Sequence, residues 1–438
     1  MTVGYVRSVR DLVIMTQFED DVPQSGELLL AHSPQRGVLL VNHLADDNVA
    51  VCLNVLGDRS IQKNMGVERT GRGVEIPVGE SILGRILDAL GRPIDGKPLP
   101  DPAKLRYKNI LQLPPRGSSF RTVSPDILET GIKVIDFFTP FVKGRKIGII
   151  GGAGVGKTVL TMELMRNVAE SGQGLSFFTG IGERIREGHE LYETLKERDL
   201  VGSTCLFFGQ MDQNPVQRVL VALSAVAGAE YARDEQKKDI LFFADNMYRY
   251  VQARNELSTI LEQVPSEGGY EPTIFSDVKI LQDRLSSNEN GSITAVQTIY
   301  VPADDLTDPA VQMIQHELDG TIVLSRKVAE QGIRPAVDLI RTSSSLLSPD
   351  IVGDRHYDLS VQVQALLQKH ESLKNIIAII GENELSPADR SDFAKARQLI
   401  NFFSQQLFVT EQFTGRTGEF VKREATLKRV ETILRGSA

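Results

Sequence analysis

This chain of 438 residues carries, at positions 151–158, the stretch Gly151-Gly-Ala-Gly-Val-Gly-Lys157-Thr158. The stretch matches the pattern G-x-x-x-x-G-K-[S/T], whose glycines let backbone N–H groups surround a phosphate chain. An apolar run at 146–150 enters it and a helical pattern at 159–170 leaves it, so that the N-terminus of a helix adds positive potential. We therefore predict a phosphate-binding loop, in which Lys157 reaches the β and γ phosphates and the Thr158 hydroxyl binds Mg²⁺. The loop consists of Gly151, Gly152, Ala153, Gly154, Val155, Gly156, Lys157 and Thr158.

The segments around this loop alternate between strand and helix patterns. Helical periodicity predicts helices at 159–170 and 216–232. Apolar, largely β-branched runs predict strands at 146–150, 175–180, 203–208, 240–244, 292–301 and 321–324. Strands that are apolar throughout are buried on both faces, so we expect a parallel sheet with helices on both sides.

Other patterns flank this α/β region. Residues 1–73 read as short alternating strands punctuated by Gly, Pro and Asp, which predicts a small antiparallel barrel or sandwich. The Pro- and Gly-rich stretch 91–118 reads as a connector. After about Ser348 the strand signals fade, and amphipathic patterns predict a helical bundle with helices at 359–369, 389–404 and 422–434. Ser386, Pro387 and Asp389 have the residue types of a helix N-cap, first position and first turn.

Composition excludes several classes of protein. Lys and Arg total 49 against 57 Asp and Glu, and the net charge of −8 argues against a surface that follows nucleic acid throughout. The two cysteines, Cys52 and Cys205, form neither a disulfide framework nor a zinc motif. The first residues lack the pattern of a targeting peptide, and no stretch approaches the ~18 apolar residues of a membrane span.

Two further segments carry candidate chemistry. Asp245 ends the apolar run 240–244, which is where proteins with a phosphate-binding loop hold Mg²⁺, usually through water. The segment Gly180-Ile-Gly-Glu183-Arg184-Ile-Arg-Glu187-Gly follows another predicted strand, and the carboxyl ends of parallel strands share one edge. Glu183 could polarise an attacking water there and Arg184 could neutralise phosphate charge. A solvated charged loop is the alternative for this segment taken alone.

Taken together, these residues resemble the beta subunit of the F-type rotary ATP synthase. The resemblance rests on the phosphate-binding loop, the segment 180–188, Gly209-Gln-Met211, Asp245-Asn246 and, above all, the segment 291–309, which includes Ala303-Asp-Asp-Leu-Thr-Asp308. It extends to Gly131-Ile-Lys-Val-Ile-Asp136 and Asp350-Ile-Val-Gly353, and so covers nearly the whole chain. It implies a multidomain α/β fold with a β-barrel over 1–74, a RecA-like nucleotide-binding domain over 75–347 and a helical domain over 348–438.

The resemblance also implies roles for individual residues. Lys157 and Thr158 bind phosphate and Mg²⁺, with ATP or ADP as the nucleotide. Glu183 is the catalytic carboxylate that organises water, and Arg184 and Arg249 contact the phosphate end. Glu187 and Asp245 help to position Mg²⁺.

The adenine pocket departs from the family pattern. Arg334 stands in Gly332-Ile-Arg-Pro335, where the beta pattern has a tyrosine. Leu407 replaces an aromatic residue, Thr410 replaces an alanine, and Phe413 matches. A guanidinium can still stack on a base, so the resemblance implies ATP binding with an altered pocket formed by Arg334, Leu407, Thr410 and Phe413.

The resemblance implies partners as well. We expect an alpha-like subunit that alternates with this chain in a hexameric ring, a central shaft subunit, an indirectly coupled membrane ion channel, and no nucleic acid. The expected location is the cytoplasmic face of the cell membrane, as a peripheral subunit. Two alternatives remain open, namely a nucleotide-binding ring subunit without turnover and a related hexameric secretion or RNA-translocating ATPase.

Overall fold

The computed structural model describes residues 3–113, 126–170, 174–266, 269–381 and 384–436. By their internal contacts they form two compact units. Unit 1 comprises Met1–Arg121 and Gly174–Ile293, and unit 2 comprises Thr122–Gln173 and Thr294–Ala438. The domain boundaries at 74/75 and 347/348 stay predictions.

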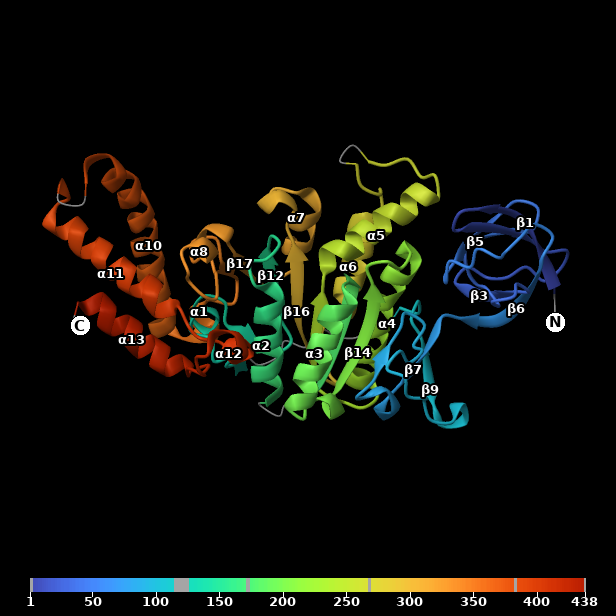
Figure 1. Cartoon of the computed structure of the whole chain (residues 1–438), viewed down its shortest axis with the longest axis horizontal. Coiled ribbons are helices and arrows are strands. Elements are labelled where there is room, and N and C mark those ends of the chain that lie inside the picture. The colour runs from blue at the N-terminus through green and yellow to red at the C-terminus, as the bar shows by residue number, and fades with distance from the viewer. Residues whose placement is uncertain (1–2, 114–125, 171–173, 267–268, 382–383, 437–438) are drawn as a thin grey trace. The chain divides into compact units, whose positions relative to one another are not determined.

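A closed six-stranded barrel occupies the N-terminal part of unit 1 (Figure 1). Its strands are β1 (Val3–Arg10), β2 (Val13–Gln17), β3 (Glu27–Ala31), β4 (Val38–Ala45), β5 (Val49–Asn54) and β6 (Gly66–Gly73). They are antiparallel in the order β1-β2-β5-β4-β3-β6. Alternate residues of a strand face one side, and Ile14, Phe18 and Leu29 fill the interior with no more than 1% exposure. The predicted barrel is confirmed.

The residues that follow the barrel form short elements. β7 (Glu75–Val78) pairs antiparallel with β9 (Arg106–Asn109). The other elements are η1 (Glu80–Ile82), β8 (Ile86–Leu87) and η2 (Pro102–Lys104). The prediction of a plain connector over 91–118 is therefore wrong for β9, whose polar sequence Arg-Tyr-Lys-Asn has no apolar period to detect. Residues 114–118 lie outside the described residues.

Unit 1 also contains four parallel strands of the central sheet, in the order β15-β13-β14-β8. The three longer strands are β13 (Leu175–Glu183), β14 (Thr204–Gln210) and β15 (Ile240–Asp245). Every residue of β15 is buried, as the uninterrupted apolar run predicts. The helices are α3 (Ile185–Glu197), η3 (Val201–Ser203), α4 (Pro215–Asp234), α5 (Met247–Ile260) and α6 (Ile274–Arg284). Helices α3, α4 and α5 all contact β13.

Unit 2 contains the remaining strands of the central sheet, in the order β18-β17-β12-β16. They are β12 (Lys146–Gly151), β16 (Ile293–Tyr300), β17 (Gly320–Leu324) and β18 (Ser343–Ser344). β12 runs parallel to both β16 and β17, and β18 runs antiparallel to β17. A separate pair joins β10 (Ile127–Leu128) to β11 (Phe141–Val142). All the strands predicted for the α/β region are confirmed.

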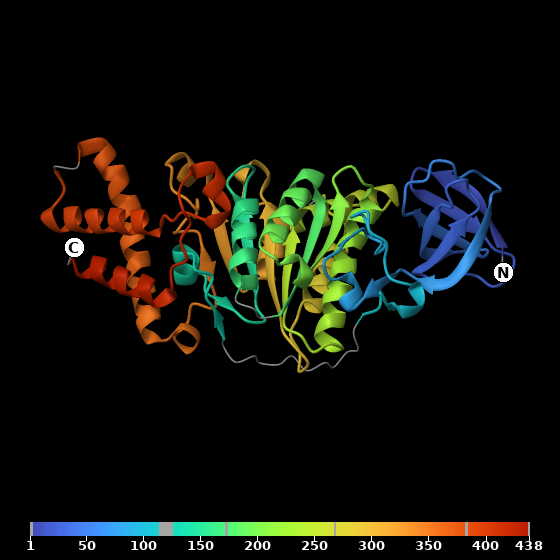
Figure 2. The ribbon, with the colours of Figure 1, turned by 60° about the horizontal axis from the view of Figure 1, so that its bottom comes forward.

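Helices make up the rest of unit 2. They are α1 (Lys133–Phe138), α2 (Lys157–Glu170), η4 (Pro302–Asp304), α7 (Pro309–His316), α8 (Arg326–Glu330), α9 (Pro349–Val352), α10 (Asp354–Ile380), α11 (Pro387–Phe403), η6 (Phe408–Thr410), α12 (Glu411–Thr414) and α13 (Arg423–Arg435). Helices α10, α11 and α13 contact one another (Figure 2), which confirms the helical C-terminal region. Among the described residues, no helix has the length and apolar character needed to span a membrane.

Helix α11 begins as its sequence predicts. The Ser386 hydroxyl accepts a hydrogen bond from the Asp389 N–H at 3.1 Å, and Pro387 occupies the first helical position. This cap satisfies a backbone donor that the first helical turn cannot satisfy internally. The Lys369 Nζ of α10 lies 2.7 Å from carboxylate oxygens of both Asp389 and Asp392, and so ties the start of α11 to α10.

A buried histidine links α10 to α1 within unit 2. His356 is 1% exposed, and its Nε2 lies 2.9 Å from the Phe137 carbonyl oxygen. The rings of Phe137, Phe138 and Phe403 pack together here at centroid distances of 4.9 to 5.2 Å. Burial lowers the pKa of His356 to about 4, because the apolar surroundings disfavour the imidazolium.

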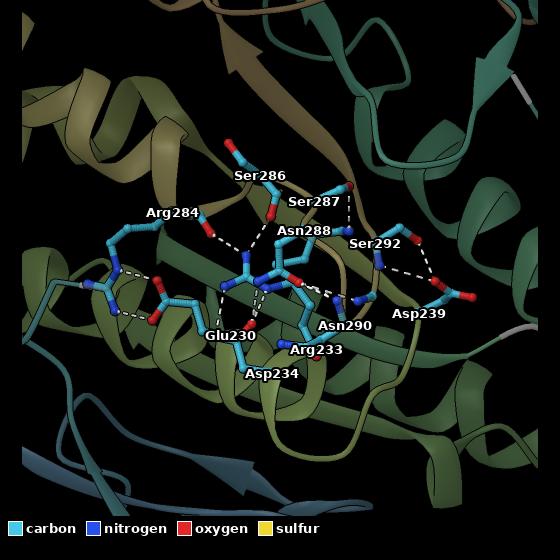
Figure 3. A network of polar contacts seen from close by, with 12 residues as sticks. Glu230, Arg233, Asp234, Asp239, Arg284, Ser286, Ser287, Asn288, Asn290 and Ser292 are labelled. Atoms are coloured by element: carbon cyan, nitrogen blue, oxygen red, sulfur yellow. Dashed lines mark hydrogen bonds and ion pairs between the residues drawn. The ribbon is translucent and has the colours of Figure 1, made fainter. Parts of the chain in front are cut away.

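A buried polar network fixes α4 in unit 1 (Figure 3). Arg284 donates from Nε and Nη2 to the two carboxylate oxygens of Glu230, at 2.9 and 2.8 Å. The two side chains are only 3% and 0% exposed. Arg284 Nη1 donates to the Ile110 carbonyl at 2.8 Å, and Lys108 Nζ lies 3.0 Å from Glu230. The network therefore joins α4 and α6 to the end of the β7–β9 ribbon.

Because it would leave the Arg284 guanidinium buried without its partner, Glu230→Ala is expected to lower the free energy of unfolding by about 3–5 kcal/mol. Urea unfolding followed by circular dichroism measures the change. Glu424→Ala is the matched control, since Glu424 makes a similar bond to Arg355 (2.8 Å) at an exposed position and should change stability far less. Equal losses in the two variants would contradict a special role for the buried pair.

His356 predicts a pH dependence of stability. In the folded state the pKa of His356 is about 4, below the unfolded value of about 6.5. Between these two pH values the unfolded state therefore binds more protons than the folded state. The free energy of unfolding should therefore fall by about 3 kcal/mol as the pH is lowered from 6.5 to 4. Thermal unfolding across this window tests it: His356→Gln, which does not titrate, should show a flatter profile. Parallel profiles for the two proteins would refute the assignment.

Candidate functional site

The predicted phosphate-binding loop lies between β12 and α2 in unit 2. Gly154 and Gly156 have φ values of 73° and 100°, in the region that favours glycine, and nothing lies within 4 Å of where their Cβ atoms would be. The conformation turns the backbone from strand to helix and leaves the concave side of the loop open. A Cβ on Gly152 would fall 1.8 Å from Asp304 Oδ1, so a larger residue there would displace the carboxylate that Arg326 binds.

The side chain of Lys157 lies against the loop. Its Nζ donates to the carbonyl oxygens of Gly151 and Gly152, at 2.9 and 2.5 Å, and stands 5.4 Å from the centre of the Tyr300 ring. Thr158 follows in the first turn of α2 and is half-buried. The ammonium and the first N–H groups of α2 thus converge on one loop, which is the donor set that a phosphate chain requires.

An ion pair that sequence reasoning missed supports the outer side of the loop. Arg326, at the start of α8, donates from Nε to Asp304 Oδ2 at 3.0 Å and from Nη2 to the Ala153 carbonyl at 3.1 Å. Asp304 belongs to the quoted motif 303–308, but Arg326 carries no local signal. Its role depends on β17 lying next to β12, which only the sheet topology reveals.

The predicted carboxylates stand at the carboxyl edge of the strands in unit 1. Parallel pairing places Gly180 of β13 opposite Asp245, the last residue of β15. Glu183 ends β13, is half-buried, and its carbonyl accepts the Met211 N–H at 3.1 Å. Arg184 caps α3 and is exposed, and Glu187 lies in the first turn of α3 and is half-buried.

Asp245 and Arg249 flank the junction between β15 and α5. Asp245 is 7% exposed. The Asn246 side chain caps α5 by accepting the Tyr248 N–H at 2.9 Å. Arg249 Nη1 donates to Gln252 Oε1 at 3.1 Å, one turn further along α5. The structure therefore brings Glu183 and Asp245 to one edge of unit 1, as predicted from the strand ends. Arg249, which only the resemblance implied, lies in the first turn of α5 and close to Gly182.

Three of the four predicted base-binding residues (Leu407, Thr410 and Phe413) lie on the segment 405–413, which is held against α2 within unit 2. The Val409 N–H donates to Glu163 Oε2 at 2.9 Å, and the Arg166 guanidinium stands 3.7 Å from the centre of the Phe408 ring. Glu163 and Arg166 belong to α2, the helix that begins at Lys157. Sequence reasoning missed both residues, because their partners, Val409 and Phe408, are more than 200 positions away along the chain.

The four base-pocket residues differ in exposure. Leu407 is 4% exposed and packs inward, whereas Phe413 is 88% exposed. The Thr410 hydroxyl donates to the Leu407 carbonyl at 2.8 Å. Arg334 is exposed, and its Nη1 donates to the carbonyls of Ala329 and Ile333, at 2.8 and 2.9 Å.

Gln405 joins the segment 405–413 to other parts of unit 2. Its N–H donates to the Arg334 carbonyl at 2.7 Å. Its side-chain Nε2 donates to the carbonyls of Gly131 and Glu419, at 2.8 and 2.6 Å, and its Oε1 accepts the Lys133 N–H at 2.8 Å. Arg334 is therefore fixed, through its backbone, to the segment that carries Leu407, Thr410 and Phe413.

Each unit by itself carries groups that suit part of a nucleotide with Mg²⁺. In unit 2, the glycine cradle and Lys157 provide positive donors for phosphate oxygens, and Thr158 provides a hydroxyl. In unit 1, Glu187 and Asp245 provide carboxylate oxygens of the kind that Mg²⁺ prefers.

Comparison with protein-family models agrees with this chemistry. Residues 131–345 match the nucleotide-binding domain of the ATP synthase alpha/beta family. Residues 347–422 match the C-terminal domain of V and A type ATP synthase. The first match contains the phosphate-binding loop, Glu183, Asp245 and Arg334, and the second contains Leu407, Thr410 and Phe413.

Lys157→Met is expected to abolish nucleotide binding while leaving the fold intact. The substitution removes the ammonium and its two part-buried bonds to the Gly151 and Gly152 carbonyls, while methionine keeps a long unbranched side chain in the same place. Equilibrium dialysis with ATP and Mg²⁺ measures binding, and circular dichroism verifies the fold. Retention of ATP affinity by the variant would exclude this loop as the phosphate site.

Proposed function

We propose that this chain, whose nucleotide-binding domain belongs to the ATP synthase alpha/beta family, is the catalytic subunit of a rotary ATP synthase. It makes ATP from ADP and phosphate, or hydrolyses ATP, in step with ion flow across a membrane. The observation that carries the proposal is Glu183, a half-buried carboxylate at the carboxyl end of β13. A subunit that holds nucleotide without turnover has no need of a base at this position.

The proposed roles follow from the chemistry of each group. Lys157 and the backbone N–H groups of the loop bind the β and γ phosphates and neutralise their charge. Thr158 and, through water, Glu187 and Asp245 would hold Mg²⁺, which would supply further positive charge to the phosphate oxygens.

The remaining roles concern the attacking water and the charge that develops during the reaction. Glu183 accepts a hydrogen bond from the water that attacks the γ phosphate in hydrolysis, and so orients it. Arg184 and Arg249 stabilise the negative charge that develops in the transition state.

The proposed partners complete the reaction. An alpha-like subunit alternates with this chain in a ring and contributes an arginine finger, and a shaft subunit transmits rotation to the membrane sector. The chain then lies at the cytoplasmic face of the membrane as a peripheral subunit. The two-domain match to ATP synthase families supports assembly into such a complex.

Rotary ATP synthases include F, V and A types, and the observations bear differently on which type this chain belongs to. The motifs at 180–188 and 303–308 resemble the F-type beta subunit, and we propose that identity. The C-terminal match names V and A types, so the F-type proposal rests on the nucleotide-binding motifs alone. Arg334 favours the competing proposal of a non-turnover subunit, because alpha-like subunits commonly carry arginine there.

Glu183→Gln in the assembled complex is expected to keep nucleotide binding and to lower ATP hydrolysis by ~10²–10⁴-fold, because the amide cannot act as a base. Steady-state ATPase assays measure the rate. Glu190→Gln is the matched control, since Glu190 lies on the exposed surface of α3 and only pairs with Arg186 at 3.4 Å. Full turnover by Glu183→Gln would overturn the catalytic assignment and favour the non-turnover subunit.

A further inference from the structure

Strand β13 contains a bulge immediately before Glu183. Ile181 pairs with Gly209 of β14. Two residues further along β13, Glu183 pairs with Gln210, which is the very next residue of β14. The extra residue is Gly182, whose φ of 65° lies in the region that favours glycine. Because a bulge bends its strand and redirects the side chains beside it, the direction of the Glu183 carboxylate depends on this bulge.

Two arginine side chains lie against the bulge. The position that a Cβ on Gly182 would take is 3.3 Å from Arg218 Cδ and 3.6 Å from Arg249 Cβ. Arg218 belongs to α4 and its side chain is only 12% exposed, whereas Arg249 belongs to α5. The bulge is therefore in contact with side chains from both helices.

The guanidinium of Arg218 is held by all three of its nitrogens. Its Nε donates to the Gln213 carbonyl at 3.1 Å. Its Nη1 donates to Glu256 Oε1 at 3.2 Å, and its Nη2 donates to the other oxygen of the same carboxylate. Two parallel bonds between planar groups fix orientation as well as distance. The Arg218 side chain is thus fixed in one orientation beside Gly182.

The Gln213 bond connects Arg218 to the backbone of Glu183. Gln213 lies in the turn that follows β14, and its Oε1 accepts the Gln210 N–H at 3.0 Å. In the same turn, the Met211 N–H donates to the Glu183 carbonyl at 3.1 Å. Arg218 therefore stabilises the turn to which Glu183 is hydrogen-bonded.

The Glu256 bonds connect the same guanidinium to α5. Glu256 lies seven residues after Arg249, which is two turns further along one face of this helix. We propose that Arg218 is a positioning residue, which holds the bulge at Gly182 so that the Glu183 carboxylate points where the reaction requires it. Arg218 acts through Glu183 and not on the nucleotide itself. This inference rests on the proposed function, because the role exists only if Glu183 is the catalytic carboxylate.

Steady-state ATP hydrolysis by the assembled complex tests the proposal. Arg218→Ala removes both anchors, and it should lower kcat by about 10–100-fold and change the KM for ATP by less than about threefold, since a misdirected carboxylate slows the reaction more than it weakens binding. The second measurement adds Arg218→Ala to Glu183→Gln. If Arg218 acts through Glu183, this double variant should be less than about threefold slower than Glu183→Gln alone.

Two further variants serve as controls, and circular dichroism verifies the fold of each protein. Arg10→Ala should keep the wild-type kcat, because Arg10 forms an exposed pair with Glu262, just beyond the end of α5, at 3.1 Å. Arg218→Lys keeps the alkyl chain beside Gly182 but cannot form the two-bond pair, so its kcat should fall by about 3–10-fold. If Arg218→Ala fails to fold, Arg218→Lys replaces it in the double variant.

The outcomes separate the inference from the proposed function. An unchanged kcat in Arg218→Ala would overturn the inference. Equal losses from Arg218→Ala with and without Glu183→Gln would also overturn it, because Arg218 would then act independently of Glu183. Both results leave the proposed function standing if Glu183→Gln alone is slow, whereas full turnover by Glu183→Gln would overturn the proposed function itself.

Discussion

The turn from β12 to α2 is the constraint on which the phosphate site depends. A strand that is buried from its second residue onward must end, and a helix must begin with its first N–H groups directed at one point. Gly154 and Gly156 meet this requirement by adopting positive φ values that other residues rarely tolerate. Two distant parts of unit 2 contact this region: Arg326 donates to the Ala153 carbonyl of the loop, and Val409 of the segment 405–413 donates to Glu163 on the helix that follows it.

Much of the fold follows from local patterns in the sequence. Largely apolar runs identified six of the eight strands described for the central sheet, because burial on both faces leaves few polar positions. The two-residue strands β8 and β18 are too short to give such a pattern. The cap at Ser386 was also predictable, since serine, proline and aspartate each satisfy a separate requirement of a helix start. β9 was not predictable, because Arg106–Asn109 has no apolar residue beyond Tyr107, and its pairing with β7 comes from the chain reversing upon itself.

The candidate site also contains residues that could be predicted from the sequence and residues that could not. The loop residues and the carboxylates at strand ends could be predicted, since a motif and a strand boundary are properties of consecutive residues. Arg326, Glu163 and Gln405 could not, because each acts on backbone atoms that are distant in sequence. The Arg284–Glu230 pair likewise joins two helices with no local signal.

The bonds that hold position 334 have a consequence for evolution. Gln405 N and Ser404 Oγ both donate hydrogen bonds to the backbone carbonyl oxygen of residue 334. Every amino acid has this carbonyl. A mutation at 334 can therefore exchange an exposed side chain while the loop keeps its path. Gln405 lacks this freedom, because its own side chain contacts Gly131, Lys133 and Glu419. Over generations, we expect residue 334 to vary among related chains and residue 405 to stay glutamine.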